Sequence, residues 1–462
     1  MIESFEEYQK SLVDERTVYY RGKLVKNVNE HPILSLEVEP VQYLFQNKFR
    51  SFNKDFNTES SIFYKIPHNS DDLLERSNMT YEITKDLGML WPHIGSDALL
   101  ASRLITYDLE TSDNFLKYHA KVVKENLFVC GAQIDVKGDR RLRPGDQEDK
   151  DLYVHVVEEN DKGIIVKGAK FHTSMAAISN EIFVLPGRSL RKGEEDYAIA
   201  FAIPAGTKNV KLIARPAIAT EGAINPMEGP RTRKRRMGET LTIFDNVFVP
   251  WERVFIYKDT KAASRLALMF ALYHRLSAVS YRAALAEHLI GLGKLMAECN
   301  GISKASHIAK NITDLITFAE IQRCCAKMAA LECHINKVPN IAIPNRIYTN
   351  VGKLFSNSNY MNVVQGLIDI AGGIAICAPS GDDYNNKELK PLIDKYMRGA
   401  YPGAERFKIM LLMREVIALM GGEESVIMIH AEGSMEASRI ELYRSYDYTE
   451  SEKIVKEILL EI

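Results

Sequence analysis

The sequence predicts an α+β protein in three parts: a mainly helical N-terminal domain (residues 1–126), a central β-barrel domain (127–260) and a C-terminal helical bundle (261–462). Apolar residues recur with helical spacing in the first and third parts, whereas short β-type runs separated by Gly, Pro, Asp and Asn fill the middle. A chain of 462 residues also exceeds the roughly 250–300 residues that one simple core supports, so several subdomains are expected.

The composition is that of a globular protein without a highly charged partner. Lys and Arg (59) nearly balance Asp and Glu (61), so neither nucleic acid nor a membrane surface is indicated. The first residues, MIESFEEYQKSLVDER, are acidic and lack the basic end and apolar core of a signal peptide. No apolar run approaches the ~18 residues needed to cross a bilayer. We therefore expect a cytoplasmic protein whose partner is a small-molecule substrate.

The six cysteines form neither a disulfide framework nor a metal motif. They are few for the length and mostly lie in segments with helical spacing, so disulfides are not expected. Cys324, Cys325, Cys333 and His334 are close in sequence, but no CxxC pair exists. Adjacent residues on a helix point about 100° apart and rarely share one ion. We predict no metal site here.

The N-terminal domain is expected to begin with a small hairpin and to continue as helices. Residues 18–20 (Val-Tyr-Tyr) and 24–25 (Leu-Val) flank a turn at Arg21-Gly22-Lys23. From about residue 70 to 126 the apolar period is helical, with one interruption that predicts a helix end where side chains turn into a cleft. The interrupting residues are Trp91, Pro92, His93 and Gly95.

Seven β-type runs in residues 127–256 predict the strands of a compact barrel or sandwich. They are LFVCGAQI, LYVHVV, GIIVKGAK, EIFVLPG, YAIAFAIP, VKLIARPA and LTIFDNVFVP.

The most informative β segment spans residues 163–187. Two β-branched runs there flank His172, Thr173 and Ser174. Hydroxyls on a closely approachable backbone suit the polar edge of a flat heterocycle, which makes these three residues candidates for cofactor binding. An ordinary strand-turn-strand with solvated hydroxyls is the alternative interpretation.

Two charged features precede the bundle. The run RTRKRR at residues 231–236 suits phosphate oxygens, but a solvated or oligomer-facing loop explains six basic residues equally well. Glu239, at the start of the last β-type run, is either a solvated strand-edge charge or a base. If it lies in an apolar cleft, its pKa rises and it can accept a proton from an activated C–H group.

Five segments with helical spacing predict the bundle. They are residues 262–298, 303–336, 346–374, 404–421 and 423–444. On the first, His274 and Tyr281 lie two turns apart on one face with Arg282 beside them. These residues either satisfy buried polar partners or line a cleft against the β domain. Gly372 and Gly373 end the third segment, as a helix C-cap or as bare backbone that a pyrophosphate approaches.

Several stretches together resemble a known flavoprotein family. They are RTVYYRGKLVKNVNEHP, KGDRRLRPGDQEDKDLYVHVVEENDKGIIVKGAK, FDNVFVPWERVF, YHR at 273–275, IDIAGGI and HAEGSMEASRI. The chain resembles the family that joins the flavin-dependent 4-hydroxyphenylacetate 3-monooxygenases to 4-hydroxybutyryl-CoA dehydratase/vinylacetyl-CoA Δ-isomerase, and it is nearer the dehydratase side. The resemblance implies an acyl-CoA dehydrogenase-like fold.

The resemblance also implies a cofactor and an assembly. FAD would lie between the β domain and the bundle, and a neighbour in a homotetramer would complete its site. By the family's pattern, Ser174 and Thr173 would lie near the flavin ring, and Gly372-Gly373 near the phosphates. His274 and Glu239 match an iron ligand and an acid/base candidate of the dehydratase.

The sequence departs from both branches of the family. The dehydratase's three cluster cysteines fall here near Met89 and His93 and at Tyr281, and its next lysine falls at Arg282. His274 alone cannot hold a [4Fe–4S] cluster. The hydroxylase's active-site histidine falls near Cys130, and its Arg-x-x-x-Tyr element has no counterpart around residues 91–98.

These features predict a FAD enzyme without an Fe–S cluster that acts on an acyl-CoA or a similar activated acid. Glu239 or His274 would abstract the α-proton, with hydride transfer to flavin or double-bond isomerisation, and Tyr281 and Arg282 would stabilise the enolate. One alternative is a hydroxylase of a phenolic acid that receives reduced flavin from a separate flavin reductase. Another is a catalytically silent flavoprotein.

Overall fold

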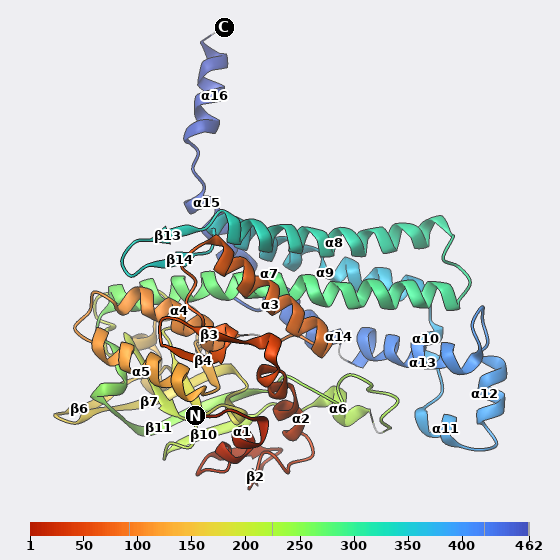
Figure 1. Ribbon diagram of the computed structural model, residues 1–462, viewed down its shortest axis with the longest axis horizontal. Helices are drawn as coiled ribbons and strands as arrows, with labels where there is room; N and C mark the ends of the chain where they lie inside the picture. The colour runs from red at the N-terminus through yellow and green to blue at the C-terminus, as the bar shows by residue number, and fades with distance from the viewer. Residues whose placement is uncertain (92, 224, 420, 461–462) are drawn as a thin grey trace.

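The computed structural model describes residues 1–91, 93–223, 225–419 and 421–460. A layer of long helices covers two packed β-sheets, and shorter helices extend the bundle to one side (Figure 1). The expected order of helices, sheet and helical bundle is therefore confirmed.

The predicted N-terminal hairpin is present, and it belongs to the central sheet. Strands β1 (Thr17–Tyr20) and β2 (Lys23–Val25) pair antiparallel, and β1 also pairs in parallel with β10 (Val210–Ala214). Arg21 and Gly22 both have positive φ angles, 49° and 75°, as a tight hairpin turn requires.

Three helices follow: α3 (Ser70–Leu87), α4 (Ile94–Thr106) and α5 (Ser112–Glu125). The side chain of Asn69 caps α3 by accepting a hydrogen bond from the Asp72 backbone N–H at 2.9 Å, and left-handed Gly88 ends the helix. The predicted interruption thus separates α3 from α4; Pro92 lies outside the described residues.

The β domain contains two sheets packed face to face. The larger has the order β2-β1-β10-β11-β7-β6, and the smaller has the order β12-β9-β8-β5. Apolar residues of both sheets, such as Val166 and Phe244 from one and Ile182 and Phe201 from the other, form one buried cluster. The further strands are β5 (Val129–Ala132), β6 (His155–Asn160), β7 (Gly163–Ser174), β8 (Glu181–Val184), β9 (Ile199–Pro204), β11 (Glu239–Pro250) and β12 (Val254–Tyr257).

The seven predicted β runs are confirmed, but residues 163–187 do not form a hairpin. Strand β7 pairs with β6 and β11 in one sheet, whereas β8 pairs with β5 and β9 in the other. The chain crosses between the sheets at left-handed Met175 and the 3₁₀ turn Ala176–Ile178. Thr173 and Ser174, 0% and 7% exposed, are buried at this crossing, so the interpretation of solvated hydroxyls is wrong for them.

The bundle is built on α7 (Thr260–Cys299), which is buried on most sides because it packs against α3, α4, α8 (Ser306–Leu331) and α9 (Arg346–Ala371). The bundle continues through α13 (Gly403–Arg414), the π-helical turn η9 (Glu415–Leu419), α14 (Gly421–His430) and α15 (Met435–Ser445). Short helices complete the chain: α1 (Phe5–Ser11), α2 (Ser35–Val38), α6 (Ile218–Gly222), α10 (Ile374–Cys377), α11 (Gly381–Asn385) and α12 (Lys390–Tyr396).

Two predicted helices were too long. The segment 303–336 ends as a helix at Leu331, and β13 (His334–Asn336) then pairs with β14 (Ile341–Ile343) around a turn that contains Pro339, which cannot continue a helix. The segment 423–444 is broken at residues 431–434, hereafter the Glu432 turn, because Glu432 and Gly433 have φ angles of 56° and 97°.

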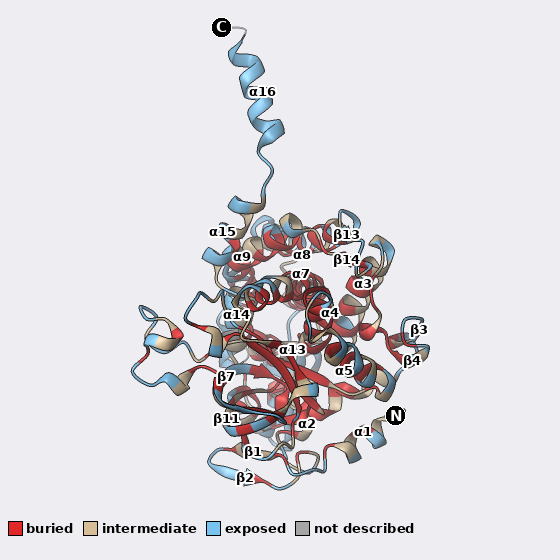
Figure 2. Ribbon diagram, turned by 90° about the vertical axis from the view of Figure 1, so that its left-hand side faces the viewer, coloured by how far each residue is buried: buried red, intermediate tan, exposed pale blue. Residues whose placement is uncertain are grey.

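The last helix, α16 (Thr449–Leu459), stands away from the body of the molecule and is exposed along its length (Figures 1 and 2). None of the described helices has the length and apolarity to span a bilayer.

Candidate active site

A buried ion network lies where α7 meets α4. The Nδ1 atom of His274 is 2.9 Å from Oδ2 of Asp97, and the other carboxylate oxygen accepts hydrogen bonds from Arg76 Nη2 at 2.7 Å and Ser277 Oγ at 3.0 Å. Burial alone would raise the pKa of Asp97, but the charge of Arg76 and the hydrogen bond from His274 keep that pKa below its usual value. An ionised Asp97 can only accept, so His274 donates from Nδ1 and keeps Nε2 available to take up a proton.

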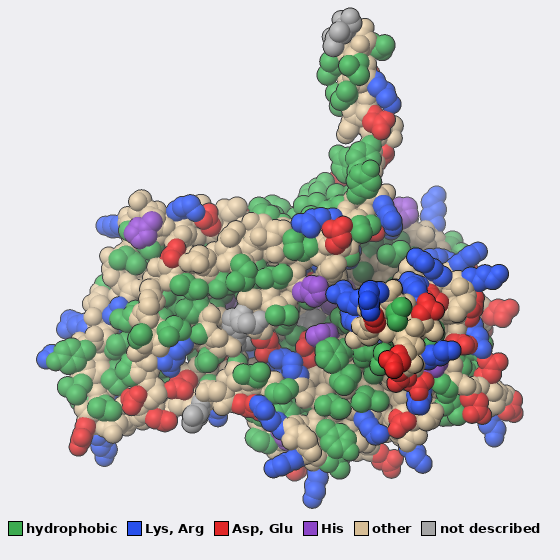
Figure 3. Space-filling model, turned by 180° about the vertical axis from the view of Figure 1, so that it is seen from behind, with side chains coloured by type: hydrophobic (Ala, Val, Ile, Leu, Met, Phe, Trp, Pro, Cys, Tyr) green, Lys and Arg blue, Asp and Glu red, His purple; other side chains and the backbone are tan. Residues whose placement is uncertain are grey.

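A pocket adjoins this network between the start of α4 and the end of β7; we call it the histidine pocket. Its lining includes Phe63, His93, Ser96, Phe128, Cys130 and Ser174. The rings of His93 and Phe63 stack with centroids 3.4 Å apart. Burial, aided by the charge of Arg76, holds the pKa of His93 well below its usual range, so this imidazole is neutral. Figure 3 shows histidine side chains beside a hollow on the back face of the molecule.

The predicted cofactor-binding residues of β7 differ in their surroundings. Ser174 faces the histidine pocket. Thr173 is fully buried, and its Oγ1 has no hydrogen-bond partner among the described residues. His172 is left-handed (φ 51°) and half exposed, and its Nδ1 lies 3.6 Å from Glu239 Oε2. The crossing between the two sheets therefore leaves a buried hydroxyl with no partner in the described part of the chain, beside a pocket with an aromatic lining.

Glu239 lies opposite Ser174 in the strand register, but it is not in an apolar cleft. Its carboxylate is 3.3 Å from Arg215 Nε, and Arg215 also binds Glu423 at 2.5 Å. Burial would raise the pKa of Glu239, but the hydrogen bond from His172 and the charge of Arg215 outweigh it and lower the pKa. An apolar cleft was the condition for a raised pKa, and Glu239 does not meet this condition, because His172 and Arg215 stabilise its charged form.

Tyr281 and Arg282 both bind Glu432, a residue that the sequence analysis did not identify. Tyr281 donates from its hydroxyl to Glu432 Oε1, and Arg282 Nη2 donates to Oε2 at 2.6 Å. Arg275 Nη2 donates to the Glu432 backbone carbonyl at 3.2 Å, and Lys353 Nζ to that of Gly433 at 2.5 Å. These contacts hold the Glu432 turn against α7 and α9.

A signal for this turn was present in the sequence. Glu432-Gly433-Ser434 places a glycine before a helix-capping serine, and Ser434 Oγ accepts from the Ala437 backbone N–H at 3.2 Å. The apolar spacing on both sides made residues 423–444 look continuous.

Gly372 and Gly373 are not part of the same site. Gly372 has a positive φ angle (64°) at the end of α9, and its backbone N–H donates to the Ile368 carbonyl, which confirms the helix C-cap. Both glycines are exposed, and a Cβ added at either would contact nothing within 4 Å. Figure 1 places α10, which follows directly, on the opposite side of the molecule from β7.

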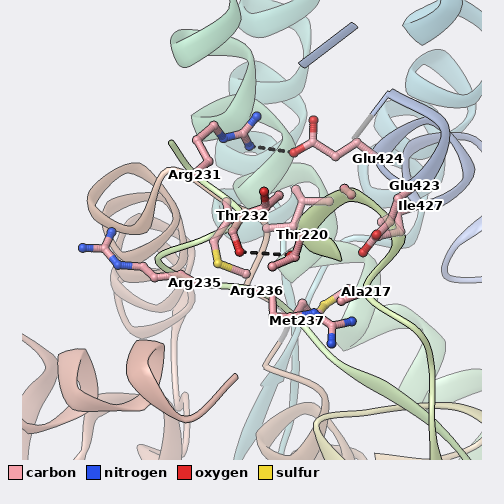
Figure 4. Close-up of a pocket in the computed structure, with 13 residues that line it drawn as sticks. Ala217, Thr220, Arg231, Thr232, Arg235, Arg236, Met237, Glu423, Glu424 and Ile427 are labelled. Atoms are coloured by element: carbon pink, nitrogen blue, oxygen red, sulfur yellow. Dashed lines mark hydrogen bonds and ion pairs between the residues drawn. The ribbon is translucent and has the colours of Figure 1, made fainter. Parts of the chain in front are cut away.

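The basic run 231–236 is docked on the body of the molecule. Arg231 Nη2 binds Glu424 at 2.6 Å, and Arg236 Nη1 binds Glu37 at 2.8 Å. Arg235 points toward the end of α3, where it donates to the Leu87 carbonyl at 3.0 Å (Figure 4). These arginines contact acceptors within the chain, which argues against a solvated loop, although Nη2 of Arg236 is buried without an acceptor among the described residues.

The residues present do not fit an Fe–S cluster. Cys130 is the cysteine in the histidine pocket, and burial raises the pKa of its thiol to about 12, so it is not a thiolate ligand. Within the ranges that the structure describes, no three His, Cys, Asp or Glu side chains are arranged to hold a metal ion.

An N-terminal helical part, two packed sheets and a bundle whose first long helix carries a buried polar site define an acyl-CoA dehydrogenase-like protein. Two family profiles together cover almost the whole chain. The 4-hydroxyphenylacetate 3-hydroxylase N-terminal profile matches residues 5–256, and the corresponding C-terminal profile matches residues 263–460. The chain belongs to the 4-hydroxyphenylacetate 3-hydroxylase family.

Relatives from both branches of the family match the chain. It is 27% identical to 4-hydroxybutyryl-CoA dehydratase/vinylacetyl-CoA-Δ-isomerase of Clostridium aminobutyricum, with 99% of each chain covered. It is 26% identical to the oxygenase component of 4-hydroxyphenylacetate 3-monooxygenase of Thermus thermophilus, over 83% of this chain and 81% of the relative. The predicted family, with both of its branches, is confirmed.

Solved structures agree with this assignment. An archaeal 4-hydroxybutyryl-CoA dehydratase from N. maritimus superimposes with a TM-score of 0.94 at 26% identity, covering 99% of this chain and 95% of the other. A 4-hydroxyphenylacetate 3-monooxygenase oxygenase component complexed with FAD gives a TM-score of 0.91 at 23% identity, with 99% and 98% covered. The second match supports the fold.

Proposed function

We propose that this protein is a FAD-dependent enzyme that removes the α-proton of a small acid activated as a thioester, with His274 as the base. The observation that carries the proposal is the buried pair of His274 and Asp97 beside the histidine pocket. The reaction then ends in dehydrogenation or in movement of the double bond.

The end of β7 fits the flavin. The unpartnered hydroxyl of Thr173 and the pocket-facing Ser174 are suited to the polar edge of the ring, and Phe63 and Phe128 provide apolar walls. Bound FAD supplies the hydride acceptor. The chain's own residues contribute its binding and orientation.

His274 is better suited than Glu239 to act as the base. Asp97 fixes the Nδ1–H tautomer and stabilises the imidazolium that forms when Nε2 takes a proton, while Arg76 keeps Asp97 ionised. The hydrogen bond from His172 and the charge of Arg215 lower the pKa of Glu239, so this carboxylate accepts a proton less readily than an ordinary glutamate.

Tyr281 and Arg282 are engaged by Glu432 in this conformation. We therefore assign them to holding that carboxylate rather than to direct stabilisation of the enolate.

A second candidate function is hydroxylation of a phenolic acid with reduced flavin from a separate reductase. The family profiles carry that description, and the aromatic lining of the histidine pocket suits a phenol ring. Both candidates use the same cofactor-binding strand.

Anaerobic absorbance spectra of the FAD-reconstituted protein, recorded with a panel of acyl-CoAs and with iron analysis, test the proposal. We expect an acyl-CoA to perturb or bleach the flavin bands of iron-free protein. Hydroxylation of 4-hydroxyphenylacetate with a reductase and O2, without an acyl-CoA response, would favour the second candidate. Flavin that responds to neither would support a silent flavoprotein.

A further inference from the structure

The Glu432 turn lies at the surface of the molecule and inserts one buried side chain into the bundle. Its backbone is partly exposed, and Gly433 is exposed, yet only 1% of the Glu432 side chain is exposed. The carboxylate thus points inward between α7 and α9 and meets the side chains of Tyr281 and Arg282. Both central residues of the turn are left-handed, which is a strained conformation for Glu432 (φ 56°).

Basic side chains outnumber carboxylates around the Glu432 turn. Arg282 binds the carboxylate of Glu432, whereas Arg275 and Lys353 donate to the backbone carbonyls of Glu432 and Gly433. The other carboxylate whose charge acts on Arg275 belongs to Glu441, which is itself paired with an arginine on α9 at 3.2 Å. Burial and the neighbouring arginines lower the pKa of Lys353 to about 7, as expected for a lysine in a cation-rich site.

Two nitrogen atoms of the Arg282 guanidinium make no hydrogen bond to the described residues. Its side chain is fully buried, and neither Nε nor Nη1 has a hydrogen-bond acceptor in the part of the chain that the structure describes. Buried donors without acceptors are destabilising, so this guanidinium has the features of a group that awaits an anion.

We infer that Arg282, Arg275 and Lys353 form a binding subsite for the carboxylate of a small acid, and that Glu432 is the internal carboxylate that fills the subsite when no ligand is bound. The carboxylate of Glu432 shows how a ligand carboxylate would bind, because it contacts Tyr281 and Arg282 at the same time. The inference rests on the proposed function and narrows its substrate to acids with a free carboxylate.

The position of the subsite supports this role. Arg282 follows His274 by about two turns of α7, so the subsite and the proposed base lie on one helix, about 12 Å apart along its axis. Withdrawal of Glu432 would relieve its left-handed backbone and open the subsite at the surface. The carboxylate belongs either to a free acid or to the far end of an acyl thioester.

Calorimetric titration of the full-length, FAD-loaded protein tests the inference. The probes are glutarate, glutaryl-CoA and butyryl-CoA, the last of which lacks a free carboxylate. Glu432→Gln removes the internal competitor and is expected to bind glutarate or glutaryl-CoA about 10-fold more tightly than wild type. Glu436→Gln, an exposed change on α15, is the matched control and should leave affinity unchanged.

Arg282→Gln is expected to lose glutarate and glutaryl-CoA binding, and Lys353→Met provides a second test if that variant does not fold. Saturable glutarate binding identifies a free acid, and binding of glutaryl-CoA alone identifies the thioester. No saturable binding, equal affinity in Glu432→Gln and wild type, or equal binding of butyryl-CoA and glutaryl-CoA would overturn the inference. Binding is measured without turnover, so failure of α-proton abstraction is a separate result.

Discussion

At the scale of single residues, the proposed chemistry depends on buried charges that come together from distant parts of the chain. Asp97 lies on α4 and His274 on α7, 177 residues apart, and Arg76 reaches them from α3. Three helices therefore have to pack correctly before the base has its partner. This makes Asp97 a positioning residue with a measurable effect.

Asp97→Asn is expected to lower kcat/KM roughly 10²–10⁴-fold, because an amide can donate to Nδ1 and stabilise the other tautomer of His274. ¹⁵N NMR of the imidazole should show the proton at Nδ1 in wild type and at Nε2 in the variant.

The same change leaves Arg76 without its buried counter-charge, so the free energy of unfolding should fall by ~3 kcal/mol. Ser277→Ala removes one hydrogen bond to Asp97 and is expected to keep the rate within about 10-fold. A folded Asp97→Asn variant with the wild-type rate and tautomer would contradict the proposed role of Asp97.

The buried side chain of His119 should make the stability of the folded protein decrease in acid. It is fully buried between Phe56 and Phe115, and neither ring nitrogen has a partner among the described residues. Burial and the nearby charge of Arg103 hold its pKa well below the ordinary 6.5. The unfolded chain therefore takes up a proton below pH 6.5 that the folded chain refuses, and stability falls as the pH decreases.

His119→Leu should remove this contribution. Relative to the variant, wild type is expected to lose ~1.4 kcal/mol of unfolding free energy for each pH unit below about 6.5. Urea unfolding at pH 7.5 and 5.5 measures the difference. Wild type and the variant both contain His93, so the contribution of His93 to the pH dependence of stability is the same in both proteins. Parallel pH dependence in the two proteins would show that His119 is not buried as described.

At the scale of elements, the sequence predicts regular segments well and interruptions poorly. The β runs and the N-terminal hairpin follow local signals and are confirmed. The Glu432 turn was missed because apolar spacing continues across it, although Gly433 and Ser434 mark a break. The short strand β12 was missed because VFIY follows the β11 run after only a brief 3₁₀ turn.

The π-helical turn η9 fixes the docked loop 231–236. Glu415 is fully buried and accepts from the Thr232 backbone N–H and hydroxyl, both at 2.8 Å. Glu415→Ala should lower the unfolding free energy by ~2–4 kcal/mol, because buried donors lose their acceptor, and should speed tryptic cleavage in the basic loop. Glu405→Ala, an exposed change on α13, is the control. Unchanged cleavage in Glu415→Ala would show that the loop is held by other contacts.

At the scale of the whole molecule, one chain does not bring all expected cofactor residues together. The sequence and the resemblance pointed to Ser174 and His274. Ser174 lies between two β-branched runs, and His274 lies in the YHR stretch of the first bundle segment. Asp97 and Glu432 were missed because their roles exist only in long-range contacts. Gly372 and Gly373 directly precede α10, which Figure 1 shows on the opposite side of the molecule from β7, so we expect another copy to bring them to a cofactor held at Ser174.

We expect a homotetramer, and helix α16 is our candidate for a contact between its copies. Its apolar side chains, including Ile454 and Ile458, are 51% and 55% exposed, and an isolated helix of 11 residues is unstable in water. Truncation after Ser445 should reduce the number of subunits per particle, as measured by sedimentation velocity, and should weaken FAD binding. A truncated protein with the same number of subunits as the full-length protein would exclude this role for α16.

The most direct test of the central claim follows α-protons by NMR. FAD-loaded protein is incubated in D2O with butyryl-CoA and glutaryl-CoA under anaerobic conditions. The proposed function predicts deuterium at the α-carbon in wild type, and loss of that exchange in a folded His274→Gln variant that still binds FAD. Exchange that persists at the wild-type rate in His274→Gln, or the absence of exchange in wild type, would contradict the assignment of His274 as the base.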